Sequence, residues 1–278
     1  MKKTIYICVL LFSFNALAQK VITKKLGDYS TLKVYNGIEV ELIKSKEHKL
    51  EIAGEKSEIV KVKNVNNTLK LSLPFSLKPE NNAAGGKVLI RLYHNNNITV
   101  IDANEGSTIT GKEISQDNLE VNSQERAFIN LVVKVEYLEV RASSGGVIKL
   151  TGTAKNQNVD VDLYGVYNGF ALNSEVNSMV KAGTGAKAEV LAGEILNAKV
   201  SFGGSIFYKG NPKVVKDKKV IGGKIDYHVL PCSKFENDST FFNKTEDYSK
   251  MKTFIDDSRK LFKEHNLSVN EYVYQDSI

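Results

Sequence analysis

The chain has 278 residues and a formal net charge of +6, and two of its basic residues, Lys2 and Lys3, lie at the extreme N-terminus. The other basic residues are scattered and rarely alternate with aromatic ones, which argues against the concentrated basic surface of a nucleic-acid-binding protein. With only Cys8 and Cys232 the chain has no disulfide framework, but a sequence of this length can build a hydrophobic core.

The N-terminus has the three parts of a secretory signal peptide. Two lysines are followed by an apolar run over residues 5–14 and then by Ala16-Leu17-Ala18. We therefore expect a signal peptide over residues 1–18, and a mature chain that begins at Gln19 without a lipid anchor. The apolar run is shorter than the roughly 20 residues of a membrane span, and no later segment approaches that length. The expected location is the periplasm, the cell surface or the medium.

Between residues 29 and 93 apolar and polar residues alternate in short runs. Alternation over a few residues is typical of half-buried β-strands, and turn residues such as Asn36-Gly37 and Asn66-Asn67 separate the runs. This region is therefore predicted to be β throughout. The runs are IEVELI from Ile38, KLEIAG from Lys49, TLKLSL from Thr68 and KVLIRLY from Lys87.

After residue 97, apolar-x-apolar segments recur with a period near 20 residues. This recurrence predicts a β-solenoid, because each coil can bury its inner face only by stacking on a neighbouring coil. Glycine clusters such as Ser143–Gly146 and Gly183–Gly185 predict tight corners, where glycine allows a positive φ or a close backbone approach. A phosphate-binding loop is the alternative, but strand-like sequence follows each cluster rather than a helix. The segments begin at Ile98, Leu119, Leu138, Val159, Met179 and Ala198.

Several segments carry a resemblance to a known family. They are VYNGIEVEL from Val34, VNNTLKLSL from Val65, SSGGVIKLTG from Ser143, AGTGAKAEVLAG from Ala182 and SFGGSIFYKGNPKVV from Ser201, with GGKI soon after. Over about Asp28 to Asp226 the chain resembles the family described as putative auto-transporter adhesin, head GIN domain. The resemblance implies a right-handed β-helix of the pectin-lyase type and a role in adhesion at the cell surface. Turns in the family usually read Gly-Ser-Gly-Asp. In this chain the residues that follow the glycine clusters are Val147, Ala186 and Ile206, so any role of the family's turn aspartates does not transfer.

Beyond Cys232 the composition changes, because glycine disappears and acidic residues outnumber basic ones. We therefore end the β domain, residues 28–232, at this point and treat residues 233–278 as a tail. Its apolar spacing predicts one amphipathic helix at about 246–265. The polar side of this helix carries both acidic and basic residues, so we expect the helix to pack on its own domain or on another copy of the chain rather than on a membrane. The apolar residues are Tyr248, Met251, Phe254, Ile255, Leu261 and Phe262.

Stacking the coils by these repeats brings acidic residues into line on the outer face. Three carboxylates in a row could bind Ca²⁺ or act as a pectinase-like cluster, or could form a solvated face that Arg141 partly neutralises. The histidines lie far apart and the sequence has no Gly-x-Ser-x-Gly, so we predict no catalytic residue, metal or cofactor. The expected ladders are Glu120, Glu139 and Asp160, and beside them Asn122, Arg141 and Asp162.

The sequence thus predicts an all-β protein, with one right-handed β-helix or β-solenoid domain followed by a helical tail. We expect an exported, non-enzymatic binding or adhesion module for a protein or polysaccharide ligand, with no nucleic-acid partner and with self-association through the apolar residues of the tail. Two alternatives stay open. One is a polysaccharide-active enzyme on a pectin-lyase-like β-helix, and the other is a periplasmic structural protein.

Overall fold

The computed structural model describes residues 21–74, 87–95 and 97–228. The expected signal peptide over residues 1–18 and the tail over residues 233–278, with its helix at about 246–265, lie outside these ranges. Within the described residues, no helix has the length and apolar character needed to cross a membrane.

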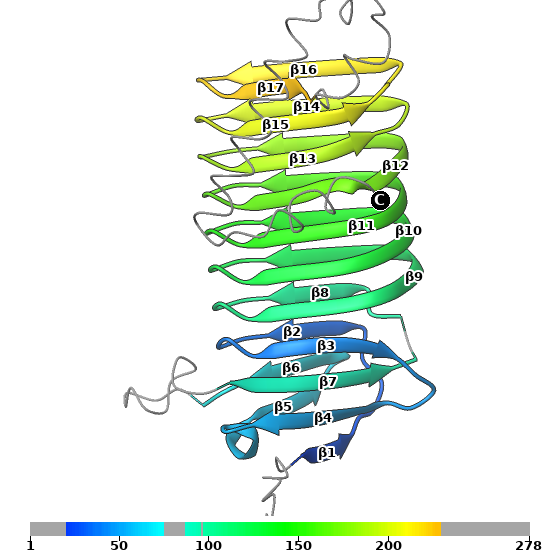
Figure 1. Ribbon diagram of the computed structural model, residues 1–278, viewed down its shortest axis with the longest axis vertical. Helices are drawn as coiled ribbons and strands as arrows, with labels where there is room; N and C mark the ends of the chain where they lie inside the picture. The colour runs from blue at the N-terminus through cyan, green and yellow to red at the C-terminus, as the bar shows by residue number, and fades with distance from the viewer. Residues whose placement is uncertain (1–20, 75–86, 96, 229–278) are drawn as a thin grey trace, which may run out of the picture. The chain divides into compact units, whose positions relative to one another are not determined.

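The described chain is a β-solenoid, as the sequence predicted (Figure 1). Each coil contributes one strand segment to each of two facing stacks, and the only helical element of the described ranges is a short 3₁₀ turn at Ser57–Ile59. The first stack contains β1 (Ile22–Lys25), β4 (Lys49–Gly54), β7 (Val88–His94), β3 (Glu39–Lys44), β13 (Lys187–Ala192), β15 (Ser205–Gly210) and β17 (Lys224–Tyr227). The second contains β5 (Lys61–Val65), β6 (Thr68–Ser72), β2 (Thr31–Val34), β8 (Val100–Ala103), β14 (Ile195–Ser201) and β16 (Val214–Val220). Four long strands run through both stacks: β9 (Thr108–Ser123), β10 (Phe128–Ala142), β11 (Val147–Val161) and β12 (Val166–Ala182).

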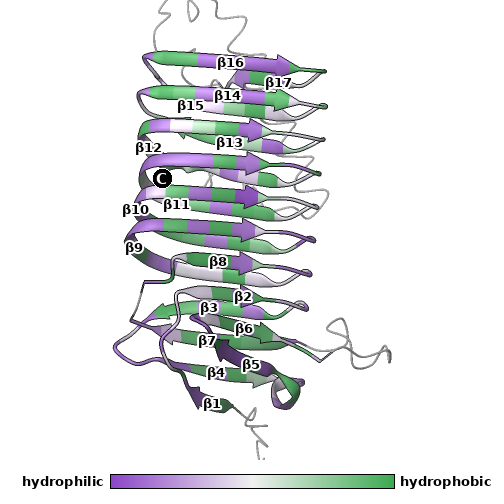
Figure 2. Cartoon of the chain, turned by 180° about the vertical axis from the view of Figure 1, so that it is seen from behind, coloured by the Kyte–Doolittle hydropathy of each residue, from purple (hydrophilic) through white to green (hydrophobic). Residues whose placement is uncertain are grey.

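Alternation along each strand builds the core between the stacks. In the second stack Val121, Val140, Val159 and Val180 are partners in successive coils, and all four side chains are fully buried. Their sequence neighbours point outward, so each strand carries alternating hydrophobic and hydrophilic bands (Figure 2). The predicted inward positions Leu119, Val121, Leu138, Val140, Val159 and Val161 are all buried.

The coils differ in length, and this corrects part of the predicted register. Leu119 and Leu138 are partners as expected, but the next partner of Leu138 is Gln157 rather than Val159. Two register shifts between β11 and β12 then lengthen the following coil, so Val159 pairs with Val180 and the predicted start Met179 points outward. Ile98 is likewise not equivalent to Leu119, because Val100 pairs with Glu120.

The N-terminal strands join the same solenoid in an order that differs from their order in the chain. β2 pairs with β8 and β3 pairs with β9, although β4 to β7 lie between them in the sequence. β4 and β5 pair antiparallel with their neighbours and form, with β1, the N-terminal layers (Figure 1).

Tight turns of three or four residues join the second stack to the first along the left edge of Figure 1. The turns are tied to one another, since the amide of Gly37 donates to the carbonyl of Glu105 at 2.9 Å and that of Gly106 donates to Glu125 at 2.9 Å. The predicted glycine corners are present. At Gly146 a Cβ atom would lie 2.2 Å from the carbonyl oxygen of Ser123, so no larger residue fits there.

The terminal strand of the second stack, β16, has two charged residues after Val215 on its inward side. Val200 of β14 pairs with Lys219 of β16, and Ala198 pairs with Asp217. Both side chains are exposed, because no further coil of the described chain covers them. Inward-pointing charges on an edge strand oppose the addition of another strand.

Candidate functional site

The outer face of the second stack carries a groove of about 570 Å³. Its wall residues come from equivalent positions of β9, β10, β11 and β12, so the groove runs across four coils spaced by about 4.8 Å. We call it the amide groove after the side chains that line it: Asn118, Tyr137, Asn156, Asn158, Asn177 and Met179.

Register places the asparagines side by side. Tyr137 lies between Asn118 and Asn156 in one row, and Asn156 is in turn the partner of Asn177. The side-chain amides of Asn156, Asn158 and Asn177 make no hydrogen bond within the described part of the chain. Each amide can therefore both donate to and accept from a ligand, which suits hydroxyl groups.

Tyr137 supplies an aromatic surface in this polar row. Its side chain is 54% exposed, and it stands at the centre of the groove wall on β10. An exposed tyrosine combines a flat apolar ring with a polar tip, which is why tyrosine is frequent at binding surfaces.

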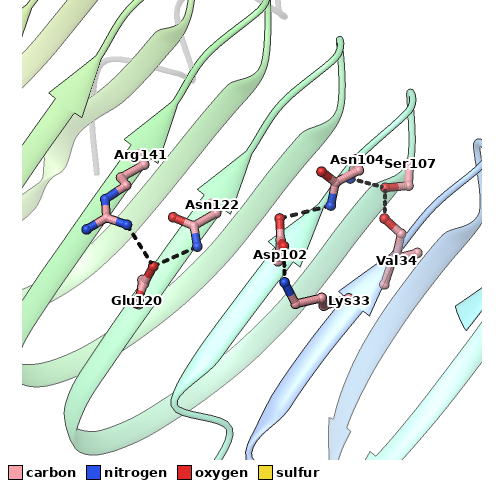
Figure 3. Close-up of polar contacts among 8 residues, drawn as sticks. All are labelled: Lys33, Val34, Asp102, Asn104, Ser107, Glu120, Asn122 and Arg141. Carbon is pink, nitrogen blue, oxygen red and sulfur yellow. Dashed lines mark hydrogen bonds and ion pairs between the residues drawn. The ribbon is translucent and has the colours of Figure 1, made fainter. Parts of the chain in front are cut away.

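Glu120 and Glu139 lie side by side at one margin of the amide groove, and Arg141 joins them. The Nη1 atom of Arg141 donates to Oε1 of Glu120 at 3.3 Å, and Nη2 donates to Oε1 of Glu139. Asn122 also donates to Oε1 of Glu120, at 2.8 Å (Figure 3). Two adjacent carboxylates would repel each other, so the shared guanidinium stabilises this pair.

The predicted three-carboxylate ladder is wrong in its third member. Asp160 pairs with Arg141 and so lies on the neighbouring row, while the partner of Glu139 is Asn158. Asp162, which we expected beside Arg141, is at the next tight turn, where its Oδ1 atom accepts from the amides of Leu163 at 2.8 Å and Thr184 at 2.7 Å. The cause is the polar residue Gln157 at an inward position, which displaced the apparent repeat by two residues. Among the described residues there is no group of three or more metal-ligating side chains.

A second, smaller pocket of about 400 Å³ continues this face toward the tight turns. On its N-terminal side, Lys33 of β2 forms an ion pair of 3.2 Å with Asp102 of β8, whose side chain is only 7% exposed. The Nδ2 atom of Asn104 donates to the same carboxylate at 2.9 Å (Figure 3). The ion pair of Lys33 with Asp102 therefore joins two coils.

The floor of the amide groove rests on a buried polar network that sequence reasoning missed. The hydroxyl of Tyr167 donates to Oε1 of Gln157 at 3.2 Å, and Nε2 of Gln157 donates to Oγ of Ser178 at 3.0 Å. Gly169 leaves room for the ring, since a Cβ atom there would lie 2.5 Å from it. Burial raises the pKa of Tyr167 above its ordinary value, so the phenol stays protonated as a donor.

Comparison with known proteins places this geometry in a family. The family model described as putative auto-transporter adhesin, head GIN domain, matches residues 28–212. The chain belongs to this family. The match spans the strands of the amide groove, and it agrees with the resemblance carried by the sequence segments. No curated protein matches the chain.

Solved structures share the solenoid of this head GIN domain protein. A putative adhesin from Bacteroides fragilis NCTC 9343 is 23% identical with a TM-score of 0.66, over 76% of this chain and 98% of that one. A putative adhesin from Parabacteroides merdae ATCC 43184 is 18% identical with a TM-score of 0.55, over 76% and 96%. A putative lipid binding protein from Parabacteroides distasonis ATCC 8503 is 17% identical with a TM-score of 0.54, over 76% and 97%. At these identities the likeness establishes the fold.

Proposed function

We propose that this head GIN domain protein is an exported, non-enzymatic adhesion module that holds a polysaccharide chain in the amide groove. The observation that carries the proposal is a group of three asparagine amides that have no hydrogen-bond partner among the described residues, two of them in the same row as the exposed ring of Tyr137. Amides that donate and accept match sugar hydroxyls, and the ring offers a surface for the apolar face of a sugar.

The solenoid makes this groove suitable for a polymer. Its wall positions repeat from coil to coil, so a long ligand would meet similar side chains at regular intervals. The backbone under them is fixed by strand pairing on both sides, so little conformational entropy is lost on binding.

The arrangement of the carboxylates favours binding over hydrolysis. A glycosidase needs two carboxyl groups that face each other across the scissile bond, one of them as an acid. Here Glu120 and Glu139 are neighbours on one face and share Arg141, and Asp160 is the strand partner of Arg141 in the next coil. The polysaccharide-active enzyme therefore remains the second candidate, supported by the fold class alone.

Export is supported by the leader with its Ala16-Leu17-Ala18 motif. Mass spectrometry of the protein from its native cell tests it, with an N-terminus at Gln19 as the expected result. A protein that retains residues 1–18 would remove this part of the proposal.

Self-association is supported by the predicted apolar stripe of the tail. Phe254→Asp is expected to lower the oligomeric state measured by light scattering. An unchanged oligomeric state would oppose this role of the stripe.

Affinity electrophoresis of the mature protein through gels containing β-glucan, xylan or pectin tests the binding function. Tyr137→Ser and Asn156→Ala should each weaken retardation by the bound polysaccharide, the former by about tenfold or more, as for aromatic residues at interface centres. The matched control is Tyr164→Ser, an exposed tyrosine at a tight turn outside the groove, which should leave retardation unchanged.

Two results would count against the proposal. One is equal retardation of Tyr137→Ser and the control, which would move the binding surface elsewhere. The other is the release of reducing sugar ends by the wild-type protein, lost in Glu139→Gln, which would favour the enzyme.

A further inference from the structure

Four large apolar side chains are exposed on the tight turns of the C-terminal half. Leu163, Tyr164, Phe202 and Ile221 are 49%, 70%, 59% and 72% exposed. They lie on the turns β11–β12, β14–β15 and β16–β17, and the turn β12–β13 lies between the first two of these (Figure 1). The amide of Tyr164 donates to the carbonyl of Thr184 at 2.9 Å, and that of Gly185 donates to Phe202 at 3.3 Å. We call these four side chains the apolar ridge.

The backbone of the apolar ridge is in an unfavourable conformation for these residue types. All four residues have a left-handed φ, from 45° at Leu163 to 61° at Tyr164, and Ile221 is β-branched. Glycine or asparagine adopts this conformation more readily, as at Asn36 and Gly37 of an earlier turn. The exposed side chains gain little packing in return, so their presence indicates a surface that is buried by something else.

Lysines flank the ridge on the second stack. Lys181, Lys199 and Lys218 are direct partners in β12, β14 and β16, so three positive charges stand in one row, and Asp160 of β11 precedes Lys181 in it. None of them forms an ion pair within the residues that the structure describes. Like charges on adjacent strands destabilise a sheet unless a counter-charge is bound. We call this row the lysine stripe.

The other flank of the ridge is neutralised. On the first stack Lys187 forms an ion pair with Glu189, and Lys224 forms one with Asp226 at 2.6 Å. The surface that meets the ridge is therefore expected to be negative on one side only, toward the second stack.

We propose that the apolar ridge and the lysine stripe dock the protein on the surface of an anionic phospholipid bilayer. Apolar side chains at the turn tips enter the interface between headgroups and acyl chains, and the lysines extend along their own stems to the phosphates. The apolar ridge is at the turn edge, and the lysine stripe lies on the same outer face of the second stack as the amide groove, nearer to the turns along β12 than Asn177 and Met179. The membrane site does not depend on polysaccharide binding, because none of its residues lines the amide groove.

The absence of tryptophan from the sequence makes a direct test of insertion available. Phe202→Trp in the mature full-length protein introduces a single indole at the ridge. With vesicles of phosphatidylcholine and phosphatidylglycerol its emission should shift to the blue, and lipids brominated on their acyl chains should quench it. Vesicles of phosphatidylcholine alone should produce a much smaller shift, and salt should weaken binding to the anionic vesicles.

Cosedimentation of the mature protein with the same vesicles tests both components. Phe202→Asn with Ile221→Asn should lower the partition coefficient more than about tenfold, since two apolar tips leave the interface. The melting temperature should stay equal or rise, because asparagine tolerates the left-handed conformation. This separates loss of docking from loss of folding.

Charge is tested by replacing the whole lysine stripe. Lys181→Gln, Lys199→Gln and Lys218→Gln together should lower partitioning roughly a hundredfold at low salt. The matched control is Lys61→Gln, Lys63→Gln and Lys134→Gln, which removes the same charge from exposed positions away from the ridge and should change partitioning far less.

Three results would overturn the proposal. The first is no blue shift with anionic vesicles. The second is a shift that depends on protein concentration without lipid, which would make the ridge a contact between two copies. The third is vesicle binding that needs the lysine stripe but is unaffected by Phe202→Asn with Ile221→Asn. If soluble polyphosphate then bound equally well, the site would be one for a polyanion.

Discussion

Gln157 and Tyr167 show how a polar pair can occupy the centre of an apolar coil. Gln157 is only 2% exposed and has an acceptor for its amide in Ser178 and a donor for its carbonyl in Tyr167. A buried amide without such partners would destabilise the fold by several kcal/mol. The network therefore fixes the position of β11 against β12 directly beneath the amide groove.

Tyr167→Phe should lower the free energy of unfolding by about 1–3 kcal/mol, because the carbonyl of Gln157 loses its buried donor. The pKa of Tyr167 is raised by burial, so above about pH 10 an unfolded tyrosine releases its proton while the folded one does not. Stability from this group is fully present below about pH 10 and falls as the pH rises further. Tyr167→Phe should make that alkaline fall shallower.

Urea unfolding at neutral and alkaline pH measures both effects. Tyr137→Phe, at an exposed position of β10, is the control and should leave the free energy of unfolding unchanged at neutral pH. An equal alkaline slope in the wild type and Tyr167→Phe would contradict the assignment to this phenol.

Along single strands, the alternation between the core and the outer face decides which substitutions matter. On β10, Val140 is fully buried between its partners Val121 and Val159, while the adjacent Glu139 side chain is 38% exposed and contacts Arg141. One residue along the strand therefore separates a core position from a groove margin.

Val140→Asp should destabilise the protein by several kcal/mol, since it buries a carboxylate without a partner. Glu139→Ala should change stability by less than about 1 kcal/mol, as is usual for a solvent-accessible ion pair. Thermal melts followed by circular dichroism compare the two variants. The opposite ranking would mean that the register of β10 is wrong.

For the solenoid as a whole, the two ends of the described chain differ. The N-terminal layers include the antiparallel strands β1, β4 and β5, whereas β16 ends the second stack with Asp217 and Lys219 on its inward side. An end with only apolar inward side chains would be a template for a further coil. Charged inward residues instead make the last coil unsuitable as a template for another apolar coil.

Asp217→Val with Lys219→Val should therefore promote association of the protein through this end. Because both side chains are exposed, the fold itself should persist, with little change in the circular dichroism spectrum. Light scattering over a range of concentrations measures the change. Lys216→Val with Lys218→Val, on the outward side of the same strand, is the matched control, and equal association of both pairs would show that general hydrophobicity is responsible.

The sequence by itself determined the class of the fold. Three features of the chain predicted strands that bury one face only by stacking: the alternation of apolar and polar residues, the period near 20 residues and the glycine corners. Each feature can be read from the sequence without knowledge of the tertiary contacts. It also determined the buried valines and the match to the head GIN family. Glu120 and Glu139 were correctly predicted as neighbours because the inward residues beside them, Leu119 and Leu138, are both apolar and show the period.

Only the tertiary structure decided the register elsewhere and the place of the sites. Gln157 interrupts the apolar pattern because its partners, Ser178 and Tyr167, are distant in the chain, so Asp160 was assigned to the wrong row. The pairing of β2 with β8 across five intervening strands is equally non-local. The amide groove, the apolar ridge and the lysine stripe each join residues about one coil apart, and their proximity depends on bulges that change coil length without a distinct sequence signal.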